Sequence, residues 1–143
     1  MTGILGAAIV AVSLSGCGSD DKSSGSTDQI SQGETIVQKF SCTSCHTANF
    51  SGDTNPQPGT MGYPANLTPD KDTGIGDWTT DQITTAILSG TDDDNETLCA
   101  PMPKFGSMGM SMADATNIAA YLKSLPEVSK MVPESSCAEK GGR

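Results

Sequence analysis

The feature that most constrains this 143-residue chain is a five-residue stretch, Cys42-Thr43-Ser44-Cys45-His46. Two cysteines three positions apart fit on one helical turn, and the histidine follows the second cysteine directly. This C-x-x-C-H pattern is typical of covalent haem attachment, in which each thiol forms a thioether with one haem vinyl group. The imidazole is then placed to bind the haem iron as the proximal ligand.

The pair Cys42 and Cys45 also fits two other kinds of site. A redox disulfide of thioredoxin type needs a βαβ context, which the sequence does not show. A structural zinc site needs four nearby ligands, and the single histidine of the chain already belongs to the motif. We therefore interpret Cys42, Cys45 and His46 as the attachment site of one covalent haem c.

The N-terminal stretch 4–14 is apolar but too short to span a bilayer as a helix. It runs into Leu14-Ser15-Gly16-Cys17, and an apolar segment before small residues is typical of an export signal. This ending resembles the lipobox of bacterial lipoproteins, which implies cleavage before Cys17 and lipidation of that residue. An ordinary secretory signal with an incidental cysteine is the alternative.

The sequence divides into four parts. We expect a lipoprotein-type signal peptide at 1–16, the lipidated Cys17 with a flexible polar linker at 17–27, a folded domain at 28–127 and a C-terminal tail at 128–143. An acylated Cys17 would hold the protein on the periplasmic side of the bacterial cell envelope, with a lipid anchor as its sole membrane attachment.

Two helices are predicted at the ends of the domain. The first, at 28–40, has apolar residues at helical spacing, and Gly33 within it permits close approach of another element. The last begins at Ser111, which forms a capping box with Asp114, and it ends before Pro126. Met110 precedes this helix as a hydrophobic staple.

A third helix is predicted at 79–89, between these two. Thr79 and Gln82 form a capping box at its start, and Gly90 suits the position just after its end. The preceding residues 47–78 show almost no periodicity, and a structureless loop of this length is unusual unless it wraps a ligand.

The arrangement resembles class I c-type cytochromes, in which an N-terminal helix with a glycine crosses a C-terminal helix with an Ala-Tyr-Leu segment. Gly33 and Ala120-Tyr121-Leu122 occupy the matching positions. The resemblance implies an all-α, small cytochrome c fold, with three or more short helices around a covalently bound haem and a long irregular loop.

Within the loop, Asn66-Leu67-Thr68-Pro69-Asp70, followed by 73–76 and Trp78, resembles a segment of many cytochrome subunits of bacterial dehydrogenases. Trp78 is expected to pack at a haem edge and to donate its indole N–H to a propionate. Packing in the core alone is an equal alternative for this residue.

The distal iron ligand is sought among the methionines, since the one histidine is already used. Met102 lies between Pro101 and Pro103, whose fixed φ angles give a rigid, extended loop. In the resembled family the axial methionine also lies in a Met-Pro pair ahead of the last helix. We choose Met102 as the distal ligand, with Met108 as the second choice. The alternative for Met102 is a gap-filling role in the core.

Two further cysteines, Cys99 and Cys137, are expected to form a disulfide in an exported protein. The acidic run at 92–96 lacks the spacing of an EF-hand and is interpreted as a solvated loop. A net charge of -9 argues against binding to nucleic acid and favours a redox partner with a basic docking surface.

These observations predict an exported, lipid-tethered monohaem cytochrome that carries single electrons between redox proteins. It would not be an enzyme itself, although it fits the cytochrome subunit of a dehydrogenase. One alternative is a haem enzyme or sensor with an open distal position, which lacks a second histidine for acid–base chemistry. The other is a structural lipoprotein without haem.

Overall fold

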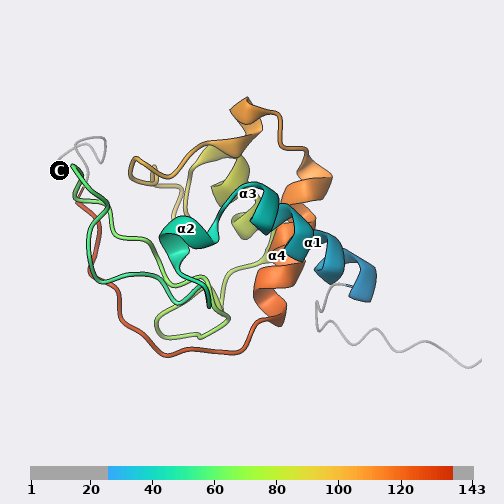
Figure 1. Cartoon of the computed structure of the whole chain (residues 1–143), viewed down its shortest axis with the longest axis horizontal. Helices are drawn as coiled ribbons and strands as arrows, with labels where there is room; N and C mark the ends of the chain where they lie inside the picture. The colour runs from blue at the N-terminus through green and yellow to red at the C-terminus, as the bar shows by residue number, and fades with distance from the viewer. Residues whose placement is uncertain (1–25, 137–143) are drawn as a thin grey trace, which may run out of the picture.

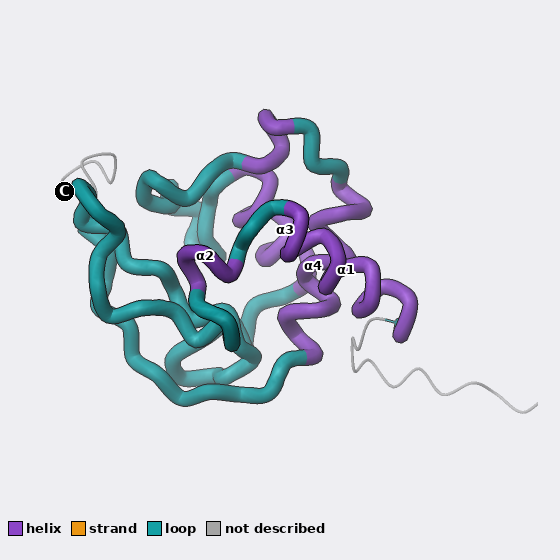
Figure 2. Tube along the Cα trace, viewed as in Figure 1, coloured by secondary structure: helices purple, strands orange, loops and turns teal. Residues whose placement is uncertain are grey.

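The computed structural model describes residues 26–136. Between these residues the chain forms α1 (Thr27–Lys39), the one-turn α2 (Thr43–His46), α3 (Thr80–Ser89), the 3-10 helix η1 (Phe105–Met108) and α4 (Met112–Ser124). No β-strand forms between residues 26 and 136, where a lone antiparallel bridge joins Thr91 and Thr97. The all-α prediction is confirmed (Figure 2).

Side-chain caps fix the starts of the three longer helices. The predicted boxes form at α3, where Thr79 pairs with Gln82, and at α4, where Ser111 pairs with Asp114. Gly90 ends α3 with a left-handed φ of 71°, as its predicted position requires. A third box, which was not predicted, joins Ser26 and Gln29 and starts α1 one residue before the predicted boundary.

Close contact between α1 and α4 depends on Gly33. A Cβ atom at this position would lie 2.1 Å from the backbone oxygen of Asn117 and 2.7 Å from the Cβ of Tyr121. Both distances are far shorter than a van der Waals contact, so a larger residue would force the helices apart. The predicted role of Gly33 in helix crossing is therefore confirmed.

The longer helices gather on one side of the molecule, and the irregular segments form the other side (Figure 1). The core joins the two sides, because Phe50 from the long loop packs edge-on against Tyr121 of α4 with ring centroids 5.8 Å apart. A buried apolar cluster continues through the helices; it includes Val37, Ile83, Ile87, Phe105, Ala115, Ile118, Ala119 and Leu122. α2 lies where the helical and irregular sides meet (Figure 1).

Candidate functional site

A cavity of about 720 Å³ lies between the helices and the long loop. Its lining comes from α2, from the loop that precedes α3, from the segment around Met102 and from residues 132–135. Most of the lining side chains are apolar. Both the volume and the apolar lining fit a site for a cofactor, for which volumes of roughly 300–1,000 Å³ are typical.

The C-x-x-C-H residues line one part of this cavity. Cys42 caps the N-terminus of α2, and its carbonyl oxygen accepts a hydrogen bond from the His46 N–H at 3.1 Å. Cys42 and Cys45 are both free and partly buried. Burial raises the pKa of Cys42, so its sulfur is a neutral thiol at neutral pH. The Cys45 sulfur lies 3.6 Å from Gln57 Oε1.

His46 is 8% exposed, and its ring orientation is fixed by a hydrogen bond of 2.9 Å between Nδ1 and the Ala65 carbonyl oxygen. A carbonyl oxygen only accepts, so Nδ1 must carry the proton, and the lone pair of Nε2 remains free to bind a metal. Burial lowers the pKa of His46 below 6.5, while the Ala65 bond acts in the opposite direction. The imidazole is therefore neutral at pH 7, as a metal ligand must be.

Three methionines line the cavity: Met102, Met108 and Met110. Met102 is partly buried and packs against the apolar cluster, whereas Met108 is 60% exposed at the C-terminal end of η1. Met110 is 5% exposed and is part of the core itself, and its N–H donates to the Phe105 carbonyl oxygen. Met110 was predicted to pack before the last helix, but its place in the cavity wall was not predicted.

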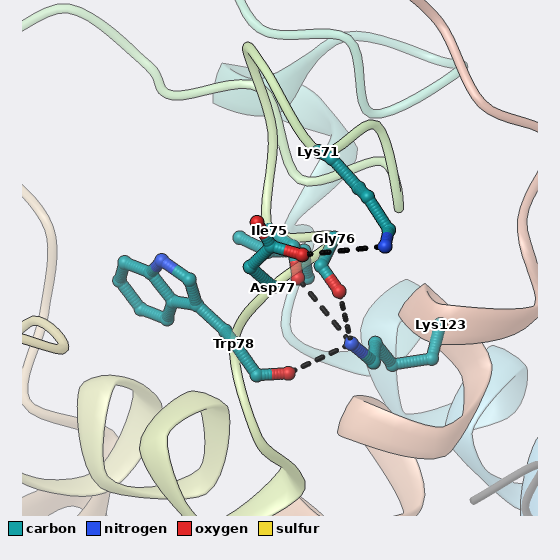
Figure 3. Close-up of polar contacts among 6 residues, drawn as sticks. All are labelled: Lys71, Ile75, Gly76, Asp77, Trp78 and Lys123. Atoms are coloured by element: carbon teal, nitrogen blue, oxygen red, sulfur yellow. Dashed lines mark hydrogen bonds and ion pairs between the residues drawn. The ribbon is translucent and has the colours of Figure 1, made fainter. Parts of the chain in front are cut away.

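Trp78 also lines the cavity, and α4 holds its backbone in place. The Lys123 ammonium donates to three carbonyl oxygens in the turn before α3, at 2.7 Å to Trp78, 2.8 Å to Gly76 and 3.5 Å to Ile75 (Figure 3). This role of Lys123 was not predicted from the sequence, because nothing in the local pattern indicates a contact across 45 residues.

Residues 126–136, which we call the C-terminal strap, run along the outside of the long loop (Figure 1). The Val128 carbonyl oxygen accepts from Asn66 Nδ2 at 2.8 Å, and the Val128 N–H donates to Thr68 Oγ1 at 3.2 Å. The Lys130 N–H donates to Thr73 Oγ1 at 3.0 Å. These bonds attach the strap to the loop segment whose sequence resembles dehydrogenase cytochromes.

The far end of the strap reaches the cavity. Ser135 Oγ accepts from the Tyr63 N–H at 2.8 Å, and the Ser136 N–H donates to the Met61 carbonyl oxygen at 3.1 Å. Residues 132–135 then form part of the cavity lining. From the sequence, residues 128–143 were expected to be a tail outside the domain, yet residues 128–136 pack against it and complete its cavity.

The remaining cysteines and the acidic run were also predicted from the sequence. Cys99 lines the cavity and is disulfide-bonded. Cys17 and Cys137 lie outside the described residues, so lipidation and the Cys99–Cys137 pairing stay predictions. In the acidic run, Asp92 Oδ1 accepts from the Glu96 N–H at 2.7 Å. Across residues 26–136 there is no group of three His, Cys, Asp or Glu side chains arranged to hold a metal ion.

Residues 28–122 match the protein family described as "Cytochrome C oxidase, cbb3-type, subunit III". This match covers all of α3, nearly all of α1 and α4, the C-x-x-C-H motif and the long loop. It ends at residue 122, within α4, and the C-terminal strap lies outside it. Within residues 26–136, no helix is both long enough and apolar enough to cross a membrane.

The chain is also similar to three named proteins. A gluconate 2-dehydrogenase cytochrome c subunit from Pantoea cypripedii is 32% identical over 98 residues, or 64% of this chain and 22% of that protein. A diheme cytochrome c-type protein from Cereibacter sphaeroides is 30% identical over 71% of this chain and 38% of its own length. A nicotinate dehydrogenase subunit from Pseudomonas putida is 31% identical over 76% of this chain and 10% of its own length.

Proposed function

Since the chain belongs to the family described as cytochrome c oxidase, cbb3-type, subunit III, and is therefore a c-type cytochrome, we propose that it carries single electrons on one covalent haem held at Cys42–His46. Haem iron supplies a one-electron couple between its ferric and ferrous states. The observation that carries the proposal is the apolar cavity of about 720 Å³, which both motif cysteines and His46 line together.

The donor set fits covalent haem. Each thiol would add across one vinyl C=C bond of the haem, its sulfur bonding to one carbon and its hydrogen moving to the other, so no oxidant would be needed. This addition requires reduced cysteines, and Cys42 and Cys45 are free. A neutral His46 with its Nδ1 proton held by Ala65 presents Nε2 as the proximal ligand.

Met102 is proposed as the distal ligand. Its partial burial and its place in the cavity lining support this role, and a thioether ligand stabilises ferrous iron and raises the reduction potential. His46 and Met102 would then both hold the iron and would leave no position on it for water or a small molecule. The role is electron transfer rather than catalysis on a bound substrate.

The visible spectrum of the exported protein tests the ligand assignment. Met102→Ala should abolish the weak long-wavelength absorption band of methionine-ligated ferric haem and lower the reduction potential. Met108→Ala is the matched control, because Met108 lines the same cavity but is 60% exposed, and it should keep both properties. If Met108→Ala lost the band and Met102→Ala kept it, the distal ligand would be Met108 rather than Met102.

A single haem is proposed because the sequence contains one C-x-x-C-H motif and one histidine. The diheme protein from Cereibacter sphaeroides is longer, since this chain covers 38% of it. Mass spectrometry of the denatured protein should therefore show the mass of one haem in addition to that of the processed and lipidated polypeptide.

The proposed electron donor is a dehydrogenase. Two relatives are named as dehydrogenase subunits, and one of these is a cytochrome c subunit. A net charge of -9, with an exposed acidic segment at 93–96, favours a partner with a basic docking surface. Raising the ionic strength should then slow reduction of the cytochrome by its partner.

Export and lipid anchoring are proposed from the N-terminal sequence. Signal cleavage before Cys17 would leave a lipidated cysteine, a polar linker to residue 27, and the haem domain on the periplasmic side of a membrane. Cys17→Ser is the direct variant. It should release the cytochrome from washed membranes into the soluble fraction, while its haem content stays unchanged.

A further inference from the structure

Lys123 makes an unusual set of contacts for a lysine near the end of a helix. Its side chain extends from α4 to the turn that precedes α3, and its ammonium group reaches the carbonyl oxygens of Ile75, Gly76 and Trp78 (Figure 3). The side chain is partly buried, and this burial lowers the pKa of Lys123. Charge-assisted bonds to carbonyl oxygens compensate for this partial loss of hydration.

The turn that Lys123 binds is also held in place by the loop that precedes it. A Cβ atom on Gly76 would lie 2.5 Å from the Pro69 carbonyl oxygen, so the turn packs closely on the preceding loop. The N–H groups of Gly74 and Gly76 both donate to the Asp70 carbonyl oxygen at 3.1 Å. Three carbonyl oxygens of this compact turn lie around the Lys123 ammonium, whose positive charge offsets the repulsion between their partial negative charges. Lys123 therefore stabilises the conformation of the turn.

The same turn carries two cavity-lining side chains, Ile75 and Trp78. Ile75 is 5% exposed, and the Trp78 ring points away from Lys123 while the Trp78 carbonyl points toward it (Figure 3). The hydrogen bond from Lys123 to the Trp78 carbonyl oxygen thus fixes the backbone that carries the Trp78 ring, which lies on the opposite side of the turn.

We propose that Lys123 is a positioning residue for the haem, which sets Trp78 and Ile75 against the cofactor and fixes a positive charge behind that wall of the cavity. This inference rests on the proposed function, since it requires haem in the cavity. A fixed positive charge favours ferrous over ferric haem, because the ferrous form carries one positive charge less. Lys123 should therefore raise the reduction potential, besides holding the turn.

The sequence offers a direct reporter, because Trp78 is the only tryptophan. Energy transfer to a nearby haem quenches indole fluorescence steeply with distance, so Trp78 emission measures how closely the ring is held to the cofactor. Lys123→Met keeps an unbranched side chain that is one atom shorter, and it removes the charge and all three hydrogen bonds. In the holoprotein this variant should show increased Trp78 emission and a lower reduction potential, with unchanged haem content.

Lys71→Met is the matched control. Lys71 forms an ion pair with Asp77 on the same turn, at 3.7 Å, but both side chains are largely exposed, at 75% and 72% (Figure 3). Its removal should leave emission and potential as in the wild type. Lys123→Arg, which keeps the charge and the donors, should restore most of the quenching and of the potential.

Each outcome decides the inference. Wild-type emission and potential in haem-loaded Lys123→Met would overturn the positioning role and leave the proposed function intact. A wild-type protein without covalent haem would overturn the proposed function, and this inference with it. If Lys123→Met does not fold, Lys123→Gln replaces it. Failure of both neutral variants to fold would assign Lys123 to fold stability alone and refute the positioning role.

Discussion

Replacing Asn66 with alanine tests whether the C-terminal strap is an integral part of the domain. Asn66 is 3% exposed. Its Oδ1 accepts from the N–H of Thr68 at 3.0 Å and from Thr68 Oγ1 at 2.8 Å. Its Nδ2 donates to the Val128 carbonyl oxygen at 2.8 Å and to Thr73 Oγ1 at 3.1 Å. One amide thus joins two parts of the loop to the strap.

The expected loss of stability depends on which hydrogen-bond partners of Asn66 are left unpaired in Asn66→Ala. The Val128 carbonyl keeps a contact with Thr68 Oγ1 at 3.3 Å, but the Thr68 N–H, on a residue that is 0% exposed, loses its acceptor. A buried donor that is left without an acceptor lowers the free energy of unfolding by about 1–3 kcal/mol, and each other lost hydrogen bond lowers it by about 0.5–1.5 kcal/mol. We expect the free energy of unfolding to fall by about 3–4 kcal/mol, a large part of the stability of a small domain.

Guanidinium unfolding of the haem-loaded protein, followed by circular dichroism, measures this loss. Asn55→Ala is the matched control, because Asn55 is exposed and donates to Asp53 Oδ1 within one turn of the same loop. The control should change the free energy of unfolding by at most about 0.5 kcal/mol. If Asn66→Ala and Asn55→Ala lower the free energy of unfolding equally, the hydrogen bonds of Asn66 do not hold the strap on the loop.

Two further predictions concern the helix crossing and the loop. Gly33→Ala should destabilise the protein by about 1–2 kcal/mol in thermal or denaturant unfolding, because the clash with the Asn117 oxygen outweighs a helix-propensity gain of about 1 kcal/mol; increased stability would contradict the crossing. Hydrogen bonds from the Thr73 hydroxyl and N–H lower the pKa of Asp70 below 3.8, so its contribution to stability is present above that pH and lost as pH falls through the lowered pKa. The stability difference between wild type and Asp70→Asn should therefore shrink below about pH 4 in unfolding curves measured from about pH 3 to 6; a difference independent of pH would refute this.

The helices could be predicted from the sequence because their signals are local. Thr79 with Gln82, and Ser111 with Asp114, lie three residues apart, and each pair forms the predicted capping box. The start of α1 was missed by one residue, because Ser26 lies in a polar stretch that was interpreted as linker.

Much of the candidate site could not be predicted, because its contacts are long-range and without periodicity. Asn66 meets Val128 across 62 residues, and Lys123 meets Trp78 across 45. The motif indicates Cys42, Cys45 and His46 directly, since haem attachment has a short, fixed spacing. Nothing comparable in the sequence indicates that residues 132–135 complete the cavity wall.

The most direct test of the central claim is whether haem is bound covalently at Cys42–His46. The exported wild-type protein should retain one haem per chain after acid–acetone extraction and denaturing electrophoresis, and its reduced spectrum should be that of low-spin c-type haem. A double variant with Cys42→Ala and Cys45→Ala should lose the covalent haem completely. Extraction of the haem from the wild type, a high-spin spectrum or covalent haem in the double variant would contradict the account.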